Sequence, residues 1–139
     1  MKVSRIAATA LALALGGCGL FDSGELWSSD RYLVLWIDEP DQAHLAYRMD
    51  DGRAVALSDP CVSAVAENVA YIAVELRAPQ SAKGPRYQLF VKGVPTPRTP
   101  PATPLGEPML RQVYEPLAQR LALPPLRAVG EWNPCGGQN

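Results

Sequence analysis

Apolar residues follow each other or alternate with polar ones over several short segments of this chain, and both patterns are typical of β-strands. The run RYLVLWID at 31–38 is almost continuously apolar and rich in branched and aromatic residues. We therefore expect a strand covered on both faces. Segments 69–78 and 85–94 alternate apolar with polar positions around the turn-forming sequence PQSAKG. They are expected to form a hairpin with a longer loop.

The segment 43–57 carries the clearest local signal. Apolar residues at alternate positions precede Asp51-Gly52, a dipeptide that favours a tight turn, and the alternation resumes after it. The pattern predicts a β-hairpin. In the next segment, 58–68, Asp59-Pro60 can start a short helix, although such a valine-rich sequence also accepts an extended form.

The composition changes in the second half of the chain. Six prolines fall within 95–108, which predicts an extended connector that cannot sustain a strand ladder. Residues 109–123 then have apolar side chains at helical spacing, namely Leu110, Val113, Leu117 and Leu121. This spacing predicts an amphipathic helix, and Pro116 is expected to kink or divide it.

Together these segments predict a small α+β domain that is mostly β. We expect an antiparallel meander of about five strands, with the kinked C-terminal helix packed on one face. The predicted domain covers residues 31–139 and includes the proline-rich connector.

The start of the chain has the pattern of an export signal. Residues 1–17 contain two basic side chains and then about ten apolar residues, far fewer than the roughly 20 that span a bilayer. The sequence LGGC that ends at Cys18 resembles the bacterial lipobox. The resemblance implies cleavage before Cys18, lipidation of its thiol and acylation of its amine, and several acyl chains hold a protein stably on a membrane. The alternative is a leader whose cysteine is incidental.

The lipoprotein interpretation also predicts a location. An aspartate after the lipidated cysteine tends to retain such proteins at the inner membrane, and here the residue is Gly19. The resemblance therefore implies a bacterial cell-envelope protein anchored in the outer membrane and facing the periplasm. Residues 18–30 are short, polar and glycine-containing, and we expect them to form the tether between the lipid and the domain.

Charge argues against nucleic acid as a partner. The leader carries two of the 13 basic residues and none of the 14 acidic ones, so 11 basic and 14 acidic side chains remain after it. The remaining chain is thus mildly acidic, and it has no cluster of Lys or Arg.

Two cysteines remain in the domain, Cys61 and Cys135. An oxidising envelope favours a disulfide between them, and the alternative is two unpaired thiols. The bridge would close a loop of about 75 residues and stabilise the fold by about 4 kcal/mol. With His44 as the only histidine, the chain makes a poor zinc site.

No motif of a hydrolase, phosphate-binding loop or metalloprotease is present. His44 is expected on the solvent face of a strand, with no nucleophile near it in sequence. The sequence therefore predicts a protein that is not an enzyme, with no cofactor, no metal and no small-molecule substrate. We expect it to act by binding a protein partner.

Carboxylates cluster in two successive turns, with Asp38, Glu39 and Asp41 in the first and Asp50 and Asp51 in the second. Their spacing matches no calcium-binding loop. Solvated turn residues are the simplest interpretation. The other is a protein-binding edge, if both turns stand at the same end of the sheet around the strand at 43–49.

Residues 43–93, from AYRMDDGRAVALSDPC to RYQLFVKG, resemble small lipoproteins that act as immunity proteins against type VI secretion lipase effectors. The shared features are a Y-R-x-D-D-x-R hairpin, a cysteine after it and two further strands. The resemblance implies a membrane-tethered periplasmic protein that neutralises an incoming phospholipase. The partner-binding residues that we expect are the hairpin residues and the preceding acidic turn, namely Arg48, Asp50, Asp51, Arg53, Asp38, Glu39 and Asp41.

Two other functions are compatible with the sequence. One is a structural or assembly accessory of the outer membrane, for which the proline-rich segment would be the docking element. The other is an inhibitor of lysozyme, a role that small disulfide-bonded lipoproteins also fill.

Overall fold

The computed structural model describes residues 22–77, 84–94 and 96–136. The predicted signal peptide and Cys18 lie outside these residues. Within them the chain forms two sheets, one 3-10 turn and one α-helix. The elements are β1 (Ser23–Ser29), β2 (Tyr32–Ile37), η1 (Pro40–Gln42), β3 (His44–Arg48), β4 (Ala54–Ala56), β5 (Val62–Glu67), β6 (Tyr71–Leu76), β7 (Arg86–Lys92), β8 (Ala102–Pro104), α1 (Arg111–Arg120) and β9 (Arg127–Ala128).

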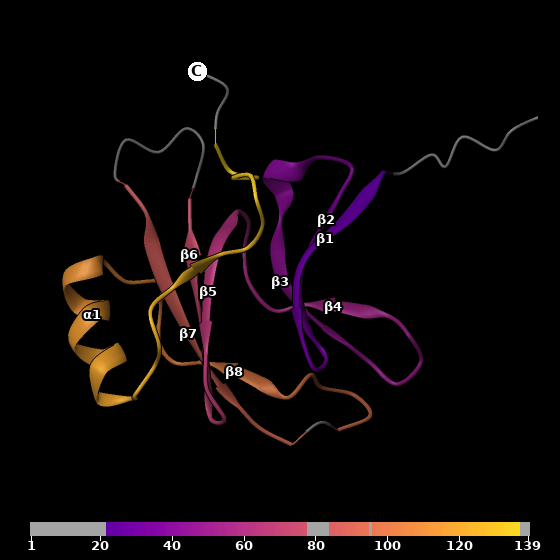
Figure 1. Ribbon diagram of the computed structural model, residues 1–139. Coiled ribbons are helices and arrows are strands. Elements are labelled where there is room, and N and C mark those ends of the chain that lie inside the picture. The colour runs from indigo at the N-terminus through magenta and orange to yellow at the C-terminus, as the bar shows by residue number, and fades with distance from the viewer. Residues whose placement is uncertain (1–21, 78–83, 95, 137–139) are drawn as a thin grey trace, which may run out of the picture.

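The strands form two antiparallel sheets that pack against each other. The first has the order β1-β2-β3-β4 and the second the order β8-β7-β6-β5-β9. Figure 1 shows the two sheets side by side, with α1 on the far face of the second sheet. The predicted class, a small and mostly β α+β fold, is confirmed. The meander, however, is divided between two sheets, because the chain crosses from one to the other between β4 and β5.

The core lies between the sheets. Alternate residues of the first sheet, such as Val34 and Leu45, meet alternate residues of the second, such as Ile72, Val74 and Phe90, and all five are fully buried. The predicted hairpin at 43–57 is confirmed as β3 and β4, and Gly52 at its tip has a positive φ of 86°. A turn of this kind favours glycine.

The helix α1 covers the outer face of the second sheet. Its buried residues are Tyr114 and Ala118, which pack against Tyr87 and Leu89 of β7. The predicted apolar face was therefore wrong in part, because Val113 is 54% exposed. The helix runs through Pro116 as one element, and the predicted division into two short pieces is not seen.

Two further strands bear on the expectations for segments 18–30 and 58–68. Residues 23–29 form β1 instead of a tether, and residues 62–67 form β5, which is the extended alternative for segment 58–68. Leu26 and Trp27 of β1 pack against the inter-sheet core, which explains why this polar-looking segment is folded. The domain therefore begins before residue 31.

The proline-rich segment also takes part in the fold. Its residues 102–104 form β8, which pairs with β7 at Phe90, Val91 and Lys92. The expectation that this segment cannot join a ladder is wrong, because a strand at the edge of a sheet tolerates proline.

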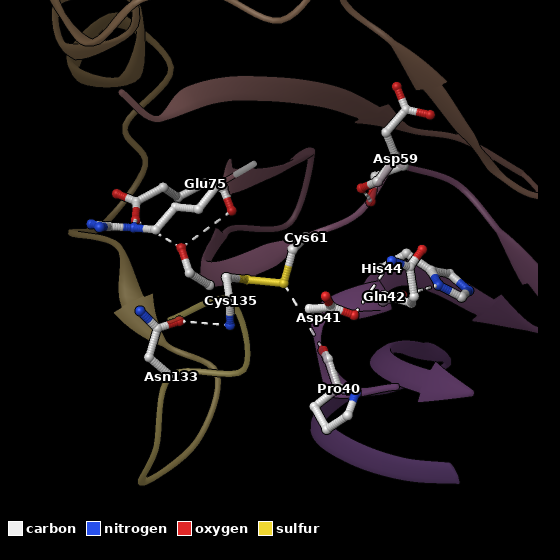
Figure 2. Close-up of a disulfide and its surroundings, with 12 residues drawn as sticks. Pro40, Asp41, Gln42, His44, Asp59, Cys61, Glu75, Asn133 and Cys135 are labelled. Carbon is white, nitrogen blue, oxygen red and sulfur yellow. Dashed lines mark hydrogen bonds and ion pairs between the residues drawn. A yellow bond between two sulfur atoms is a disulfide. The ribbon is translucent and has the colours of Figure 1, made fainter. Parts of the chain in front are cut away.

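The C-terminal segment, residues 127–135, closes one side of the sandwich. It begins as β9 beside β5, and it buries Val129 in the inter-sheet core. Figure 2 shows its end joined to the domain by a disulfide between Cys61 and Cys135, whose Cα atoms are 5.6 Å apart. The predicted pairing is confirmed. Over the described part of the chain, no helix has the length and apolar character needed to cross a bilayer.

Candidate protein-binding site

The turns of the first sheet lie at two opposite ends. Asp22 accepts a hydrogen bond from the amide of Asp38 (2.7 Å), so the start of β1 and the 38–42 turn share one end, called the η1 end. The 30–31 turn and the 49–53 turn share the other, called the hairpin end, where the amide of Arg48 donates to Arg31 (2.8 Å) (Figure 1). The two acidic turns therefore do not form one binding edge, since consecutive turns of a meander alternate between ends.

At the hairpin end the predicted acids are paired with arginines. Asp50 forms an ion pair with Arg31 of the neighbouring turn, and Asp51 accepts a hydrogen bond from Nε of Arg53 at 2.6 Å. The backbone amide of Arg53 and then its guanidinium lower the pKa of Asp51. The fourth predicted residue, Arg48, contacts Glu25 of β1 at 3.1 Å. The charged side chains at the hairpin tip are thus held in place by ion pairs within the protein.

Two hollows flank the Arg31–Asp50 pair. The hairpin hollow has a volume of about 370 Å³ and is lined also by Met49, Arg53 and Pro97. The junction hollow, of about 540 Å³, lies where the two sheets meet, and its lining includes Tyr32, Glu67 and Lys92. Both are lined by Arg31, Tyr47 and Asp50. Loops from both sheets therefore build this end of the molecule.

The junction hollow has an aromatic wall held by polar contacts. The ring of Tyr32 meets that of Tyr47 edge-on at 5.1 Å, and its hydroxyl donates to the carbonyl of Pro101 at 3.3 Å. Lys92 Nζ lies 5.2 Å from the Tyr32 ring centre and donates to Glu67 at 2.8 Å. Burial, followed by the nearby Tyr47, raises the pKa of Tyr32 to about 12, so this phenol stays neutral under ordinary conditions.

The η1 end carries the other predicted acids. Asp38, Glu39 and Asp41 lie in one exposed turn, and no ion pair between described residues involves them. His44 is partly exposed, with Nδ1 3.0 Å from the carbonyl of Gln42. In the ranges that the structure describes, no group of three or more His, Cys, Asp or Glu side chains could hold a metal ion. These carboxylates are solvated turn residues in the structure.

A buried carboxylate lies on the opposite side of the molecule, beneath α1. Glu75 is 6% exposed and accepts hydrogen bonds from Ser63 (2.7 Å), Arg77 (2.6 Å) and Tyr87 (3.1 Å). Arg111, the first residue of α1, donates to the Tyr87 hydroxyl at 2.7 Å. Burial raises the pKa of Glu75, but the hydrogen bonds from Ser63 and Arg77, the charge of Arg77 and the hydrogen bond from Tyr87 together lower it by more, so this pKa lies below its ordinary value. A groove of about 540 Å³ opens beside this cluster.

Sequence reasoning found the hairpin acids but not their surroundings. Tyr47 and Met49 were expected only as strand residues, and Lys92 and Pro97 were not singled out. Tyrosine, methionine and arginine are the residue types enriched at protein interfaces, and their occurrence beside a charged turn is the signal that could have identified this surface. Alternation in segment 69–78 places Glu75 on the face opposite Ile72 and Val74, but it does not show that a helix covers that face.

Comparison with protein-family models finds no match for this chain, and comparisons with curated proteins and with solved structures find none either.

Proposed function

We propose that this protein is a lipid-anchored envelope protein that acts by binding a protein partner at its hairpin end. The observation that carries the proposal is the convergence of loops from both sheets on two hollows there, with tyrosine, methionine and arginine in their walls. A rigid sheet scaffold that positions binding loops at one end is a common arrangement in binding proteins.

The direction of β1 supports this assignment. Cys18 precedes Asp22 by four residues, a reach of at most about 14 Å. From there β1 carries the chain about 20 Å along the sheet to the hairpin end. A lipid on Cys18 would therefore place the η1 end toward the membrane and the hairpin end toward the periplasm. Of the two acidic turns, the hairpin is the one that an approaching protein would meet.

We propose further that the partner is a phospholipase delivered by a type VI secretion system, and that binding neutralises it. The support is the resemblance of residues 43–93 to immunity lipoproteins and the expected location, where such an enzyme attacks lipids. A partner held at the hairpin end stands away from the bilayer. Binding would therefore protect the cell in two ways, by covering the active site of the phospholipase and by keeping the enzyme away from its lipid substrate.

The test is a competition assay with sibling cells that carry the secretion system. A strain without this gene should be killed, and the gene in trans should restore survival. The doubly reversed hairpin variant, Asp50→Lys with Asp51→Lys, should fail to protect. The matched variant at the η1 end, Asp38→Lys with Asp41→Lys, changes the charge equally but leaves the hairpin end intact. It should therefore protect like the native protein.

Three outcomes would contradict the proposal. If both charge-reversed variants protect fully, the hairpin end is not the binding surface. If deletion damages the envelope in the absence of any attacker, an assembly role replaces immunity. If Cys18→Ser protein protects as well as the native protein does, the anchor has no part in the function.

A further inference from the structure

Tyr47 is a buried polar residue that faces both hollows. It is 5% exposed, and it lines the hairpin hollow and the junction hollow alike. Its hydroxyl forms no hydrogen bond to any residue that the structure describes, whereas the hydroxyl of Tyr32 beside it is bonded to Pro101. Among the described residues only Arg86 Nη1 is a fully buried side-chain polar atom without a partner, so the Tyr47 hydroxyl reaches the surface. There it can donate to or accept from a group that enters the hollows.

The ion pair between Arg31 and Asp50 separates the two hollows. Both hollows are lined by these two residues, and the side chains are 46% and 89% exposed. Exposed ion pairs are weak because water and salt screen them. A partner that offers its own charge can therefore displace Arg31 from Asp50 and join the two hollows above Tyr47.

The local charge favours a cation as the displacing group. Around the hollows the three basic residues are each paired with a carboxylate, as Arg31–Asp50, Arg53–Asp51 and Lys92–Glu67. Asp30 also lines the junction hollow, and no ion pair between described residues includes it. Over residues 22–59 the chain has nine carboxylates and three arginines. This field attracts positively charged partners.

We infer that the hairpin end accepts an arginine side chain of the partner protein, seated over Tyr47 and paired with Asp50. The inference rests on the proposed function and specifies the chemistry of its partner. A guanidinium can donate to a phenol oxygen and a carboxylate together, and its flat face packs on tyrosine, which a lysine ammonium does less well. Lys92 over Tyr32 shows that the aromatic wall of the junction hollow already accommodates a cation.

The test uses the protein purified from the membrane fraction in a non-ionic detergent and labelled with ¹⁵N. The probes are acetyl-Gly-Arg-Gly-amide and its Lys and Glu counterparts, titrated at constant ionic strength. The arginine peptide should shift the amide resonances of residues 47–53 in a saturable manner. The lysine peptide should bind several-fold more weakly, and the glutamate peptide should leave these resonances unmoved. A glutamate peptide that binds as well as the arginine peptide overturns the inference.

Two variants and two controls test the named groups. Tyr47→Phe and Asp50→Asn should each weaken the arginine peptide several-fold. Tyr114→Phe, under α1, and Asp59→Asn, outside both hollows, should bind it like the native protein. Unchanged binding by Tyr47→Phe contradicts the inference. If the peptides do not bind but the hairpin variant still loses protection in the competition assay, the arginine inference falls and the proposed function stands.

Discussion

Glu75 shows how one residue can connect several elements. It is buried on β6, and its carboxylate receives hydrogen bonds from Ser63 of β5, Arg77 just after β6 and Tyr87 of β7. Through Tyr87 it also fixes Arg111 at the start of α1, and the Tyr87 ring stacks on Tyr114 at 4.8 Å. Because these side chains all donate to the carboxylate or to the phenol next to it, we interpret this cluster as structural.

Replacement of Glu75 by Gln is expected to destabilise the fold by about 2–3 kcal/mol. The amide keeps the shape but loses charge-assisted hydrogen bonds and leaves donors facing each other. Urea denaturation measures the change. The matched control is Glu107→Gln in an exposed turn, which should alter the free energy of unfolding by less than about 0.5 kcal/mol. An equal effect of both substitutions would show that the cluster contributes nothing.

The same carboxylate predicts a pH dependence. The pKa of Glu75 is lowered in the folded state, so its stabilising contribution is complete above the ordinary glutamate pKa of about 4.3 and disappears as the pH falls through the lower folded value. The difference in unfolding free energy between native protein and Glu75→Gln should therefore be constant from pH 7 to 5 and shrink below pH 4. A difference that grows on acidification contradicts the assignment.

At the scale of elements, local pattern predicted strands well and their partners poorly. The Asp51-Gly52 turn and the runs at 31–38, 69–78 and 85–94 are strands or hairpins as expected. The strand β5 was ambiguous because a register shift between Val62 and Ala64 interrupts its alternation. The assignment of strands to two sheets, and with it the hollows around Tyr47, depends on contacts distant in sequence that periodicity does not contain.

Asn68 links the β5–β6 turn to α1. Its Oδ1 accepts hydrogen bonds from the amides of Ala70 (3.0 Å) and Tyr71 (2.9 Å), and its Nδ2 donates to the carbonyl of Leu121 (2.8 Å) beyond the end of α1. The side chain therefore serves two elements with its two ends.

Asn68→Asp separates these roles. The carboxylate retains both acceptor contacts in the turn but loses the donor to Leu121, so hydrogen exchange should accelerate in residues 121–123 and stay slow in β5 and β6. Asn68→Ala removes the acceptor contacts as well as the donor contact, so it should accelerate exchange in the turn too. Equal protection of residues 121–123 in the native protein and Asn68→Asp would exclude this connection.

At the scale of the whole molecule, the disulfide joins the start of the second sheet, at Cys61 before β5, to the C-terminal segment 127–135. It lies at the η1 end, where Cys61 Sγ is 4.0 Å from the carbonyl of Pro40 and the amide of Cys135 donates to Asn133 (Figure 2). One covalent bond thus ties the start of β5 to the C-terminal segment, next to the η1 turn.

Replacement of both Cys61 and Cys135 by Ser is expected to lower the free energy of unfolding by about 4 kcal/mol, since the closed loop is long. Urea denaturation of the native protein with and without a thiol reductant gives the same comparison without mutation. The double-serine variant is the control, because a reductant should not change its midpoint. A native protein whose midpoint ignores the reductant would contradict the expected contribution.

The two cysteines lie 74 residues apart in the sequence, so the disulfide can form only after both parts of the chain are present. The disulfide that closes this edge of the sandwich can form only after both cysteines have reached an environment that oxidises thiols. Until the disulfide forms, the C-terminal segment is held by the two-residue pairing of β9 and by the packing of Val129. A copy kept in a reducing environment therefore retains a loose edge that proteases can attack, whereas the disulfide protects this edge in the oxidised protein.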